Sequence, residues 1–594
     1  MLFGGIVNNT AFQLASVALA PAGRPSFGTL THWSMPIFSL GAAALAIVAL
    51  AQPSPPPDRI FINGRIWTGT AARPYAEALA VREDRLVAVG TTAEVQRRKG
   101  PTTVVTDLGR RLVVPGFIDS HWHFSPTDRA DLDDGGSLAE IITRLRTHAA
   151  SHPTGWIQGR GWAYNDFPNR TPDRRQLDSV FPDRPVVIWE RDGHMVLVNS
   201  LALAKVGVDR TTQDPPNGRI ERDRAGELTG EFKESAMDLV TRLLPEPTPD
   251  EADLALQRIM TRAASFGLTS VHLVNGLSPA EMTAFERNLA RKSFAVRFYV
   301  AVPFTEGATD STLAGYLKLK EKYRGPFLKF GAAKGMLDGT VDAKTAAMLK
   351  PYVGAGTDAG IPMWRQEALN RAVAQYDRAG LQIMLHAIGD QAIRMALDAY
   401  QAAARTNHSS GRRHRIEHLE VPDPADLPRF KRLGVIASTQ AMFAYPDATT
   451  LGNYAGLLGP ARASRANAFK KLDDAGAIQA FGSDFPVFTM EVLKGINTAV
   501  NRTTVAGTPS GGWYPENRVS VATALKHFTR DGAFASFEES DKGTLETGKL
   551  ADFVVLSKDI LAEPPARLMD AKVLLTVMGG RETYRADSAV WAIP

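Results

Sequence analysis

Two histidines separated by one residue are the side chains of this sequence best suited to chemistry. His121 and His123 stand in the run Asp119-Ser120-His121-Trp122-His123, which follows the apolar residues 112–118. That apolar run predicts a buried β-strand. Because side chains two residues apart point to the same side of a strand, both imidazoles project together from its carboxyl end. The spacing favours two nitrogen ligands for one metal ion, although two histidines can also meet by chance on an ordinary strand.

Four further polar residues end later apolar runs: Lys334, His386, His418 and Asp484. Each has an ordinary alternative role. A lysine can extend its amine to solvent, a histidine can be satisfied by internal hydrogen bonds, and an aspartate in a Gly-Ser-Asp turn can cap a helix. A lysine buried near metal ions can instead carry CO2 as a carbamate, and composition does not distinguish these two states of Lys334. Two histidines at successive strand ends, added to His121 and His123, favour a shared metal site.

The elements that position these residues are short apolar strands alternating with helical stretches. After the strand that ends at His121, the predicted strands are residues 269–274, 296–302, 327–334, 382–386, 415–418, 434–439 and 477–481. Helical periodicity marks residues 391–404 and 462–475 in the connections. Eight such units predict an α/β fold, a TIM (β/α)8 barrel, whose chemistry gathers at the carboxyl ends of the strands. Closing the barrel places Asp484, after the last strand, beside His121 and His123, and Gly482 lets the backbone come close.

The remaining segments predict two additions to the barrel, which spans residues 113–540. Residues 125–265 are too long for a single connection and predict an inserted lid subdomain after the first strand. Residues 59–112 and 541–594 hold short apolar runs broken by turns, and Asn63-Gly64 is a β-hairpin signal. We expect the two chain ends to form one composite β-sandwich.

Composition excludes several classes of protein. The 594 residues carry a net charge of only +5 and no dense Lys/Arg block, so nucleic-acid binding is not indicated. Cysteine is absent, which excludes disulfides, thiolate metal sites and a cysteine nucleophile.

Residues 1–58 form a signal-like amino terminus with a proline-rich linker. Residues 37–51 are uniformly small or apolar, which is short for a membrane span of about 20 residues but suits the core of a signal peptide. Ala49-Leu50-Ala51 before Gln52 fits a cleavage site. The pattern predicts export to the periplasm or the medium, and a membrane tether formed by residues 37–51 is the alternative.

Motifs spread along the chain resemble a known superfamily. In order they are VVPGFIDSHWH, GAAKGMLDG, LHAIGDQA, RIEHLEV, FGSDFPV and GKLADFVVL. These resemble the amidohydrolase superfamily and, more narrowly, amidohydrolase family 3, the branch of the YtcJ-like proteins and N-substituted formamide deformylase. The motifs are specific for this branch and not for a substrate.

The resemblance implies a centre of two divalent metal ions. Zn2+ is the expected ion, and Mn, Fe, Co or Ni are alternatives. His121 and His123, with Asp484, would bind the more buried ion, and His386 and His418 the more exposed one. Lys334, carboxylated by CO2, would bridge the two ions. Asp390 and Glu417 are expected to orient ligands or to serve the structure.

The resemblance also implies a reaction. Asp484 would act as general base toward metal-activated water and then as general acid toward the leaving nitrogen. His194, in the insertion, is the candidate electrophile for the oxyanion, and packing of the lid is its equal alternative. The expected substrate is a small N-substituted amide, formamide or N-acyl amine with a non-peptide C–N bond. Deamination, cyclic-amide opening, or a non-catalytic exported binding protein are the alternatives, and a homodimer is expected by analogy.

Overall fold

The computed structural model describes residues 55–133 and 136–587 of the chain. The described residues 56–587 belong to one compact unit. The signal-like residues 37–51 and the cleavage site at Ala51 lie outside the described residues. No helix in the described part of the chain has both the length and the apolar character needed to cross a membrane.

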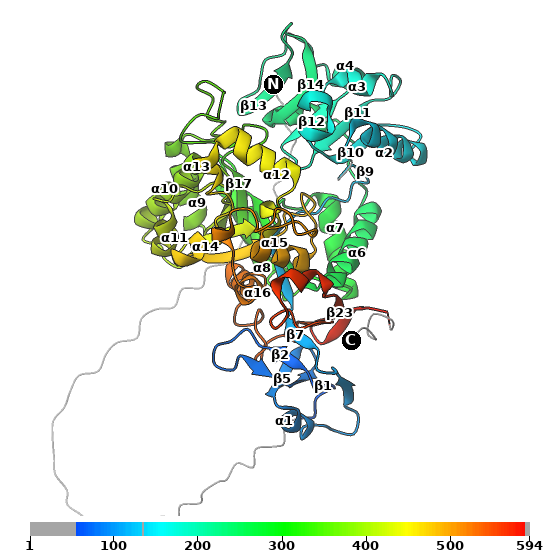
Figure 1. The fold of residues 1–594 in the computed structure, drawn as a ribbon, viewed down its shortest axis with the longest axis vertical. Helices are drawn as coiled ribbons and strands as arrows, with labels where there is room; N and C mark the ends of the chain where they lie inside the picture. Colours follow the sequence, from blue (N-terminus) through cyan, green and yellow to red (C-terminus); the bar gives the residue numbers. More distant parts are fainter. Residues whose placement is uncertain (1–54, 134–135, 588–594) are drawn as a thin grey trace, which may run out of the picture. The chain divides into compact units, whose positions relative to one another are not determined.

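An eight-stranded parallel barrel lies at the centre of this unit (Figure 1). In sheet order its strands are β21 (Ile478–Gly482), β20 (Ile436–Gln440), β19 (Arg415–His418), β18 (Gln382–Ala387), β17 (Leu328–Met336), β16 (Arg297–Pro303), β15 (Leu268–Leu273) and β8 (Phe117–Trp122). The ring closes where the amide of Asp484 donates to the carbonyl of His121 at 2.8 Å and the amide of His123 donates to that of Phe485 at 2.8 Å. The predicted TIM barrel is confirmed, and every predicted barrel strand overlaps an observed one.

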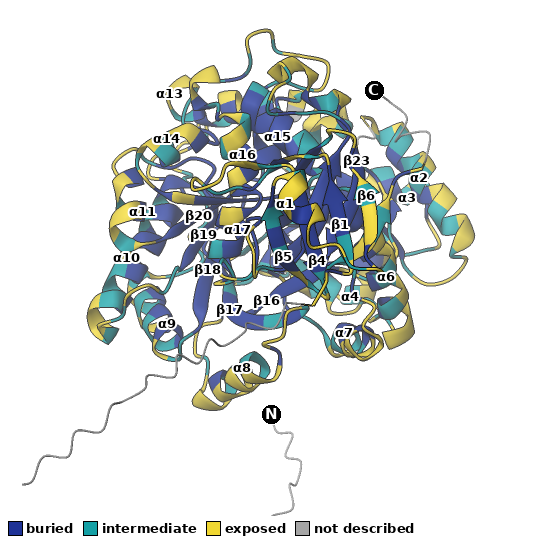
Figure 2. Ribbon diagram, turned by 90° about the horizontal axis from the view of Figure 1, so that it is seen from below, coloured by how far each residue is buried: buried dark blue, intermediate teal, exposed yellow. Residues whose placement is uncertain are grey.

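The barrel strands are buried because helices cover the outside of the sheet. Figure 2 shows buried strands beneath helices with exposed outer faces. These helices are α6 (Pro249–Ser265), α7 (Pro279–Arg291), α8 (Asp310–Lys322), α9 (Gln366–Arg378), α10 (Asp390–Asn407), α11 (Leu427–Leu433), α14 (Phe469–Asp474), α15 (Val492–Asn501), α16 (Val521–His527) and α17 (Arg530–Ala535). Capping boxes at Thr248 and Ser278 begin α6 and α7.

Two predictions about elements of the barrel are wrong. The apolar run 112–118 is not one strand, because it divides at Gly116 into β7 (Leu112–Pro115) and β8, which belong to different sheets. A Cβ at Gly116 would lie 2.3 Å from Oγ1 of Thr269, so only glycine fits the crossing point. The periodic stretch 462–475 is not one helix, since Asn467, at φ 51°, separates α13 (Pro460–Ala463) from α14.

Both ends of the chain form the β-sandwich, and their strands lie side by side (Figure 1, blue and red). One sheet has the order β5 (Arg85–Gly90), β4 (Ala78–Arg82), β1 (Arg59–Ile62), β6 (Val104–Asp107). The other has the order β24 (Arg581–Arg585), β23 (Val573–Met578), β22 (Phe553–Leu556), β7, β2 (Arg65–Trp67), β3 (Tyr75–Ala76). The hairpin predicted at Asn63-Gly64 is wrong, because β1 and β2 pair in different sheets and the turn carries the chain between them.

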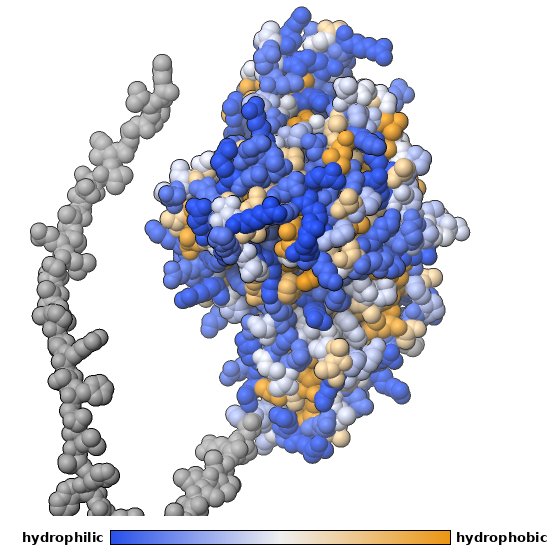
Figure 3. Space-filling model, turned by 90° about the vertical axis from the view of Figure 1, so that its left-hand side faces the viewer, coloured by the Kyte–Doolittle hydropathy of each residue, from blue (hydrophilic) through white to orange (hydrophobic). Residues whose placement is uncertain are grey.

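The insertion has its own mixed sheet. Its order is β13 (Gly218–Arg222), β14 (Leu228–Glu234), β12 (Met195–Val198), β11 (Val186–Glu190), β10 (Ile157–Trp162), β9 (Ala130–Asp131). The accompanying helices are α2 (Leu138–Ser151), α3 (Arg174–Asp178), α4 (Ser200–Val206) and α5 (Asp238–Thr241). The next helix, α6, packs its buried face into the barrel core. Figure 3 shows one face of the molecule as largely hydrophilic, with small hydrophobic groups between.

Candidate metal centre

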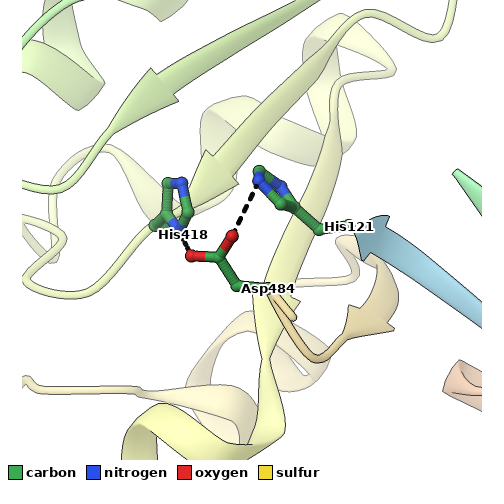
Figure 4. A group of neighbouring side chains, drawn as sticks. All are labelled: His121, His418 and Asp484. Atoms are coloured by element: carbon green, nitrogen blue, oxygen red, sulfur yellow. Dashed lines mark ion pairs between the residues drawn. The ribbon is translucent and has the colours of Figure 1, made fainter. Parts of the chain in front are cut away.

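His121, His418 and Asp484 converge at the carboxyl end of the barrel (Figure 4). One potential ligand atom from each lies within 4.8 Å of those of the other two. Nε2 of His121 is 3.4 Å from Oδ1 of Asp484, and Nδ1 of His418 is 3.8 Å from Oδ2. Nε2 of His123 lies 2.9 Å from the same Oδ1. His121 and His418, which the resemblance assigns to different ions, therefore both face one carboxylate.

The other two predicted ligands lie in the same place. The ring of His386 is centred 4.4 Å from that of His418, and its Nε2 is 3.6 Å from Oδ1 of Asp338. Lys334 lines a cavity of about 370 Å³ together with His123, His386, His418 and Asp484. The Lys334 amine, when protonated, lowers the pKa of all four histidines. The structure thus brings all six predicted ligands together.

The chemical state of these groups fits a divalent cation. Nε2 of His121 and Nδ1 of His418 are buried and have no hydrogen-bond partner among the described residues, and the buried Oδ1 of Asp484 faces the nitrogens of His121 and His123. Burial lowers the pKa of His121 and His418 well below the usual value, so both imidazoles are neutral and keep a free lone pair. Burial alone would raise the pKa of Asp484, but the neighbouring His121 and His123 lower it, so Asp484 is a carboxylate. Nitrogen and oxygen donors without thiolates suit Zn2+ and similar ions.

Glu417 fixes the direction in which His121 offers its free nitrogen. Nδ1 of His121 donates to Oε2 of Glu417 at 2.6 Å, which leaves Nε2 facing the centre. Arg415 holds the same carboxylate, with Nε donating to Oε1 at 2.8 Å and Nη2 to Oε2 at 3.0 Å. Asp390 instead accepts from the amide of Leu349 at 2.7 Å and has a structural role.

The turn that carries Asp484 is held against the first strand. Asp119 accepts the amide of Ser483 at 2.9 Å and its hydroxyl at 2.5 Å. A Cβ at Gly482 would lie 2.6 Å from the backbone nitrogen of His121, so the close approach requires glycine. Asp484 and His418 adopt φ of 58° and 75°, unfavourable values for non-glycine residues that packing must enforce. Asp484 caps no helix in the described ranges.

His194 reaches the cavity from the turn between β11 and β12. Its ring is centred 4.9 Å from that of His386, and Nδ1 lies 2.9 Å from Oε2 of Glu234. Burial alone would lower the pKa of His194, but the Glu234 carboxylate raises it to about 9. The imidazole lines the cavity and leaves Nε2 available there.

Sequence reasoning overlooked Arg415, Asp119 and Glu234 as partners of the site. Arg415 could have been found, since it stands two residues before Glu417 on one strand and so points to the same side. Glu234 had no such signal, because the pairing of β12 with β14 brings it to His194 from 40 positions away.

Comparisons with known proteins find similar chains in several organisms. A protein from Arabidopsis thaliana named LONG AFTER FAR-RED 3 is 32% identical over 98% of each chain. The putative amidohydrolase YtcJ of Bacillus subtilis is 30% identical over 88% of this chain and 99% of its own. N-substituted formamide deformylase of Arthrobacter pascens is 28% identical over 89% and 98%. A solved structure of an uncharacterized metal-dependent hydrolase from Pyrococcus horikoshii, 23% identical, shares the fold at a TM-score of 0.67 over 85% of this chain and 99% of that one.

The sequence model of the amidohydrolase family matches residues 104–584, which span the barrel, the insertion and most of the carboxyl-terminal part of the sandwich. The expected hydrolase of carbon–nitrogen bonds is thereby confirmed at the level of the family. The chain belongs to the amidohydrolase family, in the branch that its motifs resemble.

Proposed function

We propose that this protein hydrolyses the C–N bond of a small N-substituted amide, formamide or N-acyl amine at a centre of two divalent cations, with Zn2+ foremost. The observation that carries the proposal is the convergence of three buried ligand atoms, from His121, His418 and Asp484, at the carboxyl end of the barrel. The relative named N-substituted formamide deformylase supports this type of bond.

Five of the six predicted ligands would divide between the two ions. His121, His123 and Asp484 would hold one ion, and His386 and His418 the other. Bound divalent cations supply Lewis acidity and lower the pKa of water from 15.7 to about 7.

Lys334 would bridge the ions as a carbamate. Within residues 55–133 and 136–587, the Lys334 amine has no hydrogen bond, and no carboxylate lies within 4 Å of it. The amine stands among four histidines. Burial lowers the pKa of Lys334, which favours the neutral amine. That amine adds to CO2, forms the N–C bond and releases one proton.

Two side chains of the protein handle the reacting atoms. The Asp484 carboxylate accepts a proton from the attacking water and passes it to the leaving nitrogen. His194 donates from Nε2 to the carbonyl oxygen as negative charge develops there, while Glu234 holds its other ring nitrogen. Both side chains line the same cavity.

The test is metal content per chain, measured by elemental analysis, beside turnover of N-formyl and N-acyl amines. We expect near two ions in the wild type, fewer in Lys334→Ala, and partial recovery when a small carboxylate is added. Lys329→Ala is the matched control, because Lys329 lies on the same strand and donates to the carbonyl of Ser536. Asp484→Asn should abolish turnover while the fold is kept.

Two results contradict the proposal. One ion in both the wild type and Lys334→Ala would make Lys334 an ordinary lysine and direct the search to deamination. No ion in either protein would support a binding protein without catalysis.

A further inference from the structure

Two arginines from the insertion stand at the edge of the metal centre. Arg129 precedes β9, Arg160 lies in β10, and these two strands pair in parallel. Both side chains line the cavity of about 370 Å³ that holds the histidines and also a second cavity of about 820 Å³. The two cavities share His123 and the arginines, so a molecule that reaches the centre from the larger cavity passes both guanidinium groups.

Arg129 is a cation without a counterion among the described residues. Its guanidinium lies 4.0 Å from the ring centre of Trp189, which fixes its position. Nε is buried without a hydrogen-bond partner, and no described carboxylate lies within 4 Å of the group. Burial, with the charge of Arg160, lowers the pKa of Arg129 to about 10, so the group is still charged at neutral pH.

Arg191 in the same larger cavity provides the contrast. It pairs with Asp447 at 3.3 Å, as a partly buried arginine is expected to do. A partly buried cation left without a partner favours the binding of an anion, and the planar fork of arginine suits a carboxylate.

Arg160 places this positive charge close to the reacting atoms. Its Nη2 donates to the carbonyl of Arg191 at 2.8 Å, which orients the guanidinium. Its charge acts on both His123 and Asp484. An anion held by the two arginines therefore lies in the same cavity that His123 and Asp484 line.

We propose that Arg129, supported by Arg160, binds a carboxylate of the substrate, so that the preferred substrate is an N-acyl or N-formyl amino acid and not a neutral amide. This inference rests on the proposed hydrolysis of a C–N bond. It assigns the insertion the task of selecting substrates by charge.

A pair of substrates that differ only in the carboxylate tests the inference. N-formylphenylalanine, in both enantiomers, and N-formylphenethylamine are compared on the metal-loaded wild type, Arg129→Met and Arg129→Lys. The wild type should prefer the carboxylate, and Arg129→Met should lose about 10- to 100-fold in kcat/KM for it, mostly through KM. N-formylphenethylamine should change less than threefold. Arg129→Lys, which keeps the charge but not the fork, should recover part of the loss.

Arg258→Met is the matched control, since the exposed Arg258 lines only the larger cavity. Binding of 3-phenylpropionate, measured by calorimetry, gives a readout that does not depend on turnover. This binding should weaken at least tenfold in Arg129→Met and should not weaken in Arg258→Met. Equal binding of this acid by the wild type and Arg129→Met overturns the anion site, even if N-formylphenethylamine is hydrolysed. If neither N-formyl compound is hydrolysed but the binding of 3-phenylpropionate still depends on Arg129, the proposed reaction is overturned. The anion site then stands.

Discussion

Replacing Glu417 with glutamine tests whether one buried carboxylate organises both the barrel interior and the metal site. Three donors point at this group: Nδ1 of His121 at 2.6 Å, and Nε and Nη2 of Arg415 at 2.8 and 3.0 Å. The side chains of all three residues are fully buried. Glutamine has the same shape, but its amide has one accepting oxygen and its NH2 faces a donor. The Arg415 cation then has no anion beside it.

The expected cost follows from this geometry. Removing one partner of a buried ion pair costs about 3–5 kcal/mol, because the other charge stays desolvated. Unfolding entropy of about 2.1 cal/mol/K per residue gives about 1.1 kcal/mol/K for residues 56–587, so Tm should fall by about 3–5 °C. Because Glu417 also selects the ring nitrogen that His121 offers, metal affinity should fall about 10- to 100-fold.

The assay is calorimetric unfolding of metal-free protein, followed by metal titration of the folded variant. Glu539→Gln is the control, since Glu539 makes a similar two-pronged pair with Arg413 but its side chain is 39% exposed. Its Tm should change by less than about 1 °C. If Glu417→Gln matches this control in Tm and binds metal as tightly as the wild type, the reasoning is refuted.

Two further predictions concern the close approach at the centre and the pH dependence of stability. Gly482→Ala should reduce metal content, because its Cβ would lie 2.6 Å from the backbone nitrogen of His121. Gly315→Ala is the control and should be neutral or stabilising, because Gly315 lies in α8 with open space around it. Equal loss of metal in both variants would contradict the steric argument. Burial alone would lower the pKa of His527, but hydrogen bonds with two aspartates raise it above the usual value. The stabilisation is therefore full below about pH 6.5 and is lost as pH rises through the folded pKa. The Tm difference between wild type and His527→Gln should shrink as the pH rises above about 6.5, and a constant difference would refute this assignment.

The sequence predicted the barrel well because its strands are buried on both faces. A strand covered by helices on one side and by the barrel interior on the other is apolar along much of its length, so residues 298–302 of β16 and 383–385 of β18 stand out as apolar runs in the sequence. The positions of His386 and His418 then followed from the rule that chemistry gathers at the carboxyl ends of strands.

Local signals failed where tertiary structure assigns one segment to two places. Asn63 adopts the φ of 55° that a tight turn favours, yet the strands on either side choose partners in different sheets. The apolar run 112–118 is a second example. Both β7 and β8 need apolar residues, so the apolar pattern does not mark the boundary between them at Gly116. Periodicity reports which side of a segment is buried, and it does not report against which neighbour.

The division between what was predicted and what was overlooked has a physical basis. Ligands such as His121 and Asp484 stand on barrel strands, whose ends the fold itself brings together, so their types and order along the chain are enough to gather them. The partners that tune these ligands come from other elements: Glu234 reaches His194 across the inserted sheet, and Arg129 rests on Trp189. Insertions between barrel strands can vary without disturbing the barrel, whereas the ligands cannot move. Selection of the substrate is therefore expected to depend on the insertion, where Arg129 lines the cavity of the metal centre and has no counterion within 4 Å among the described residues.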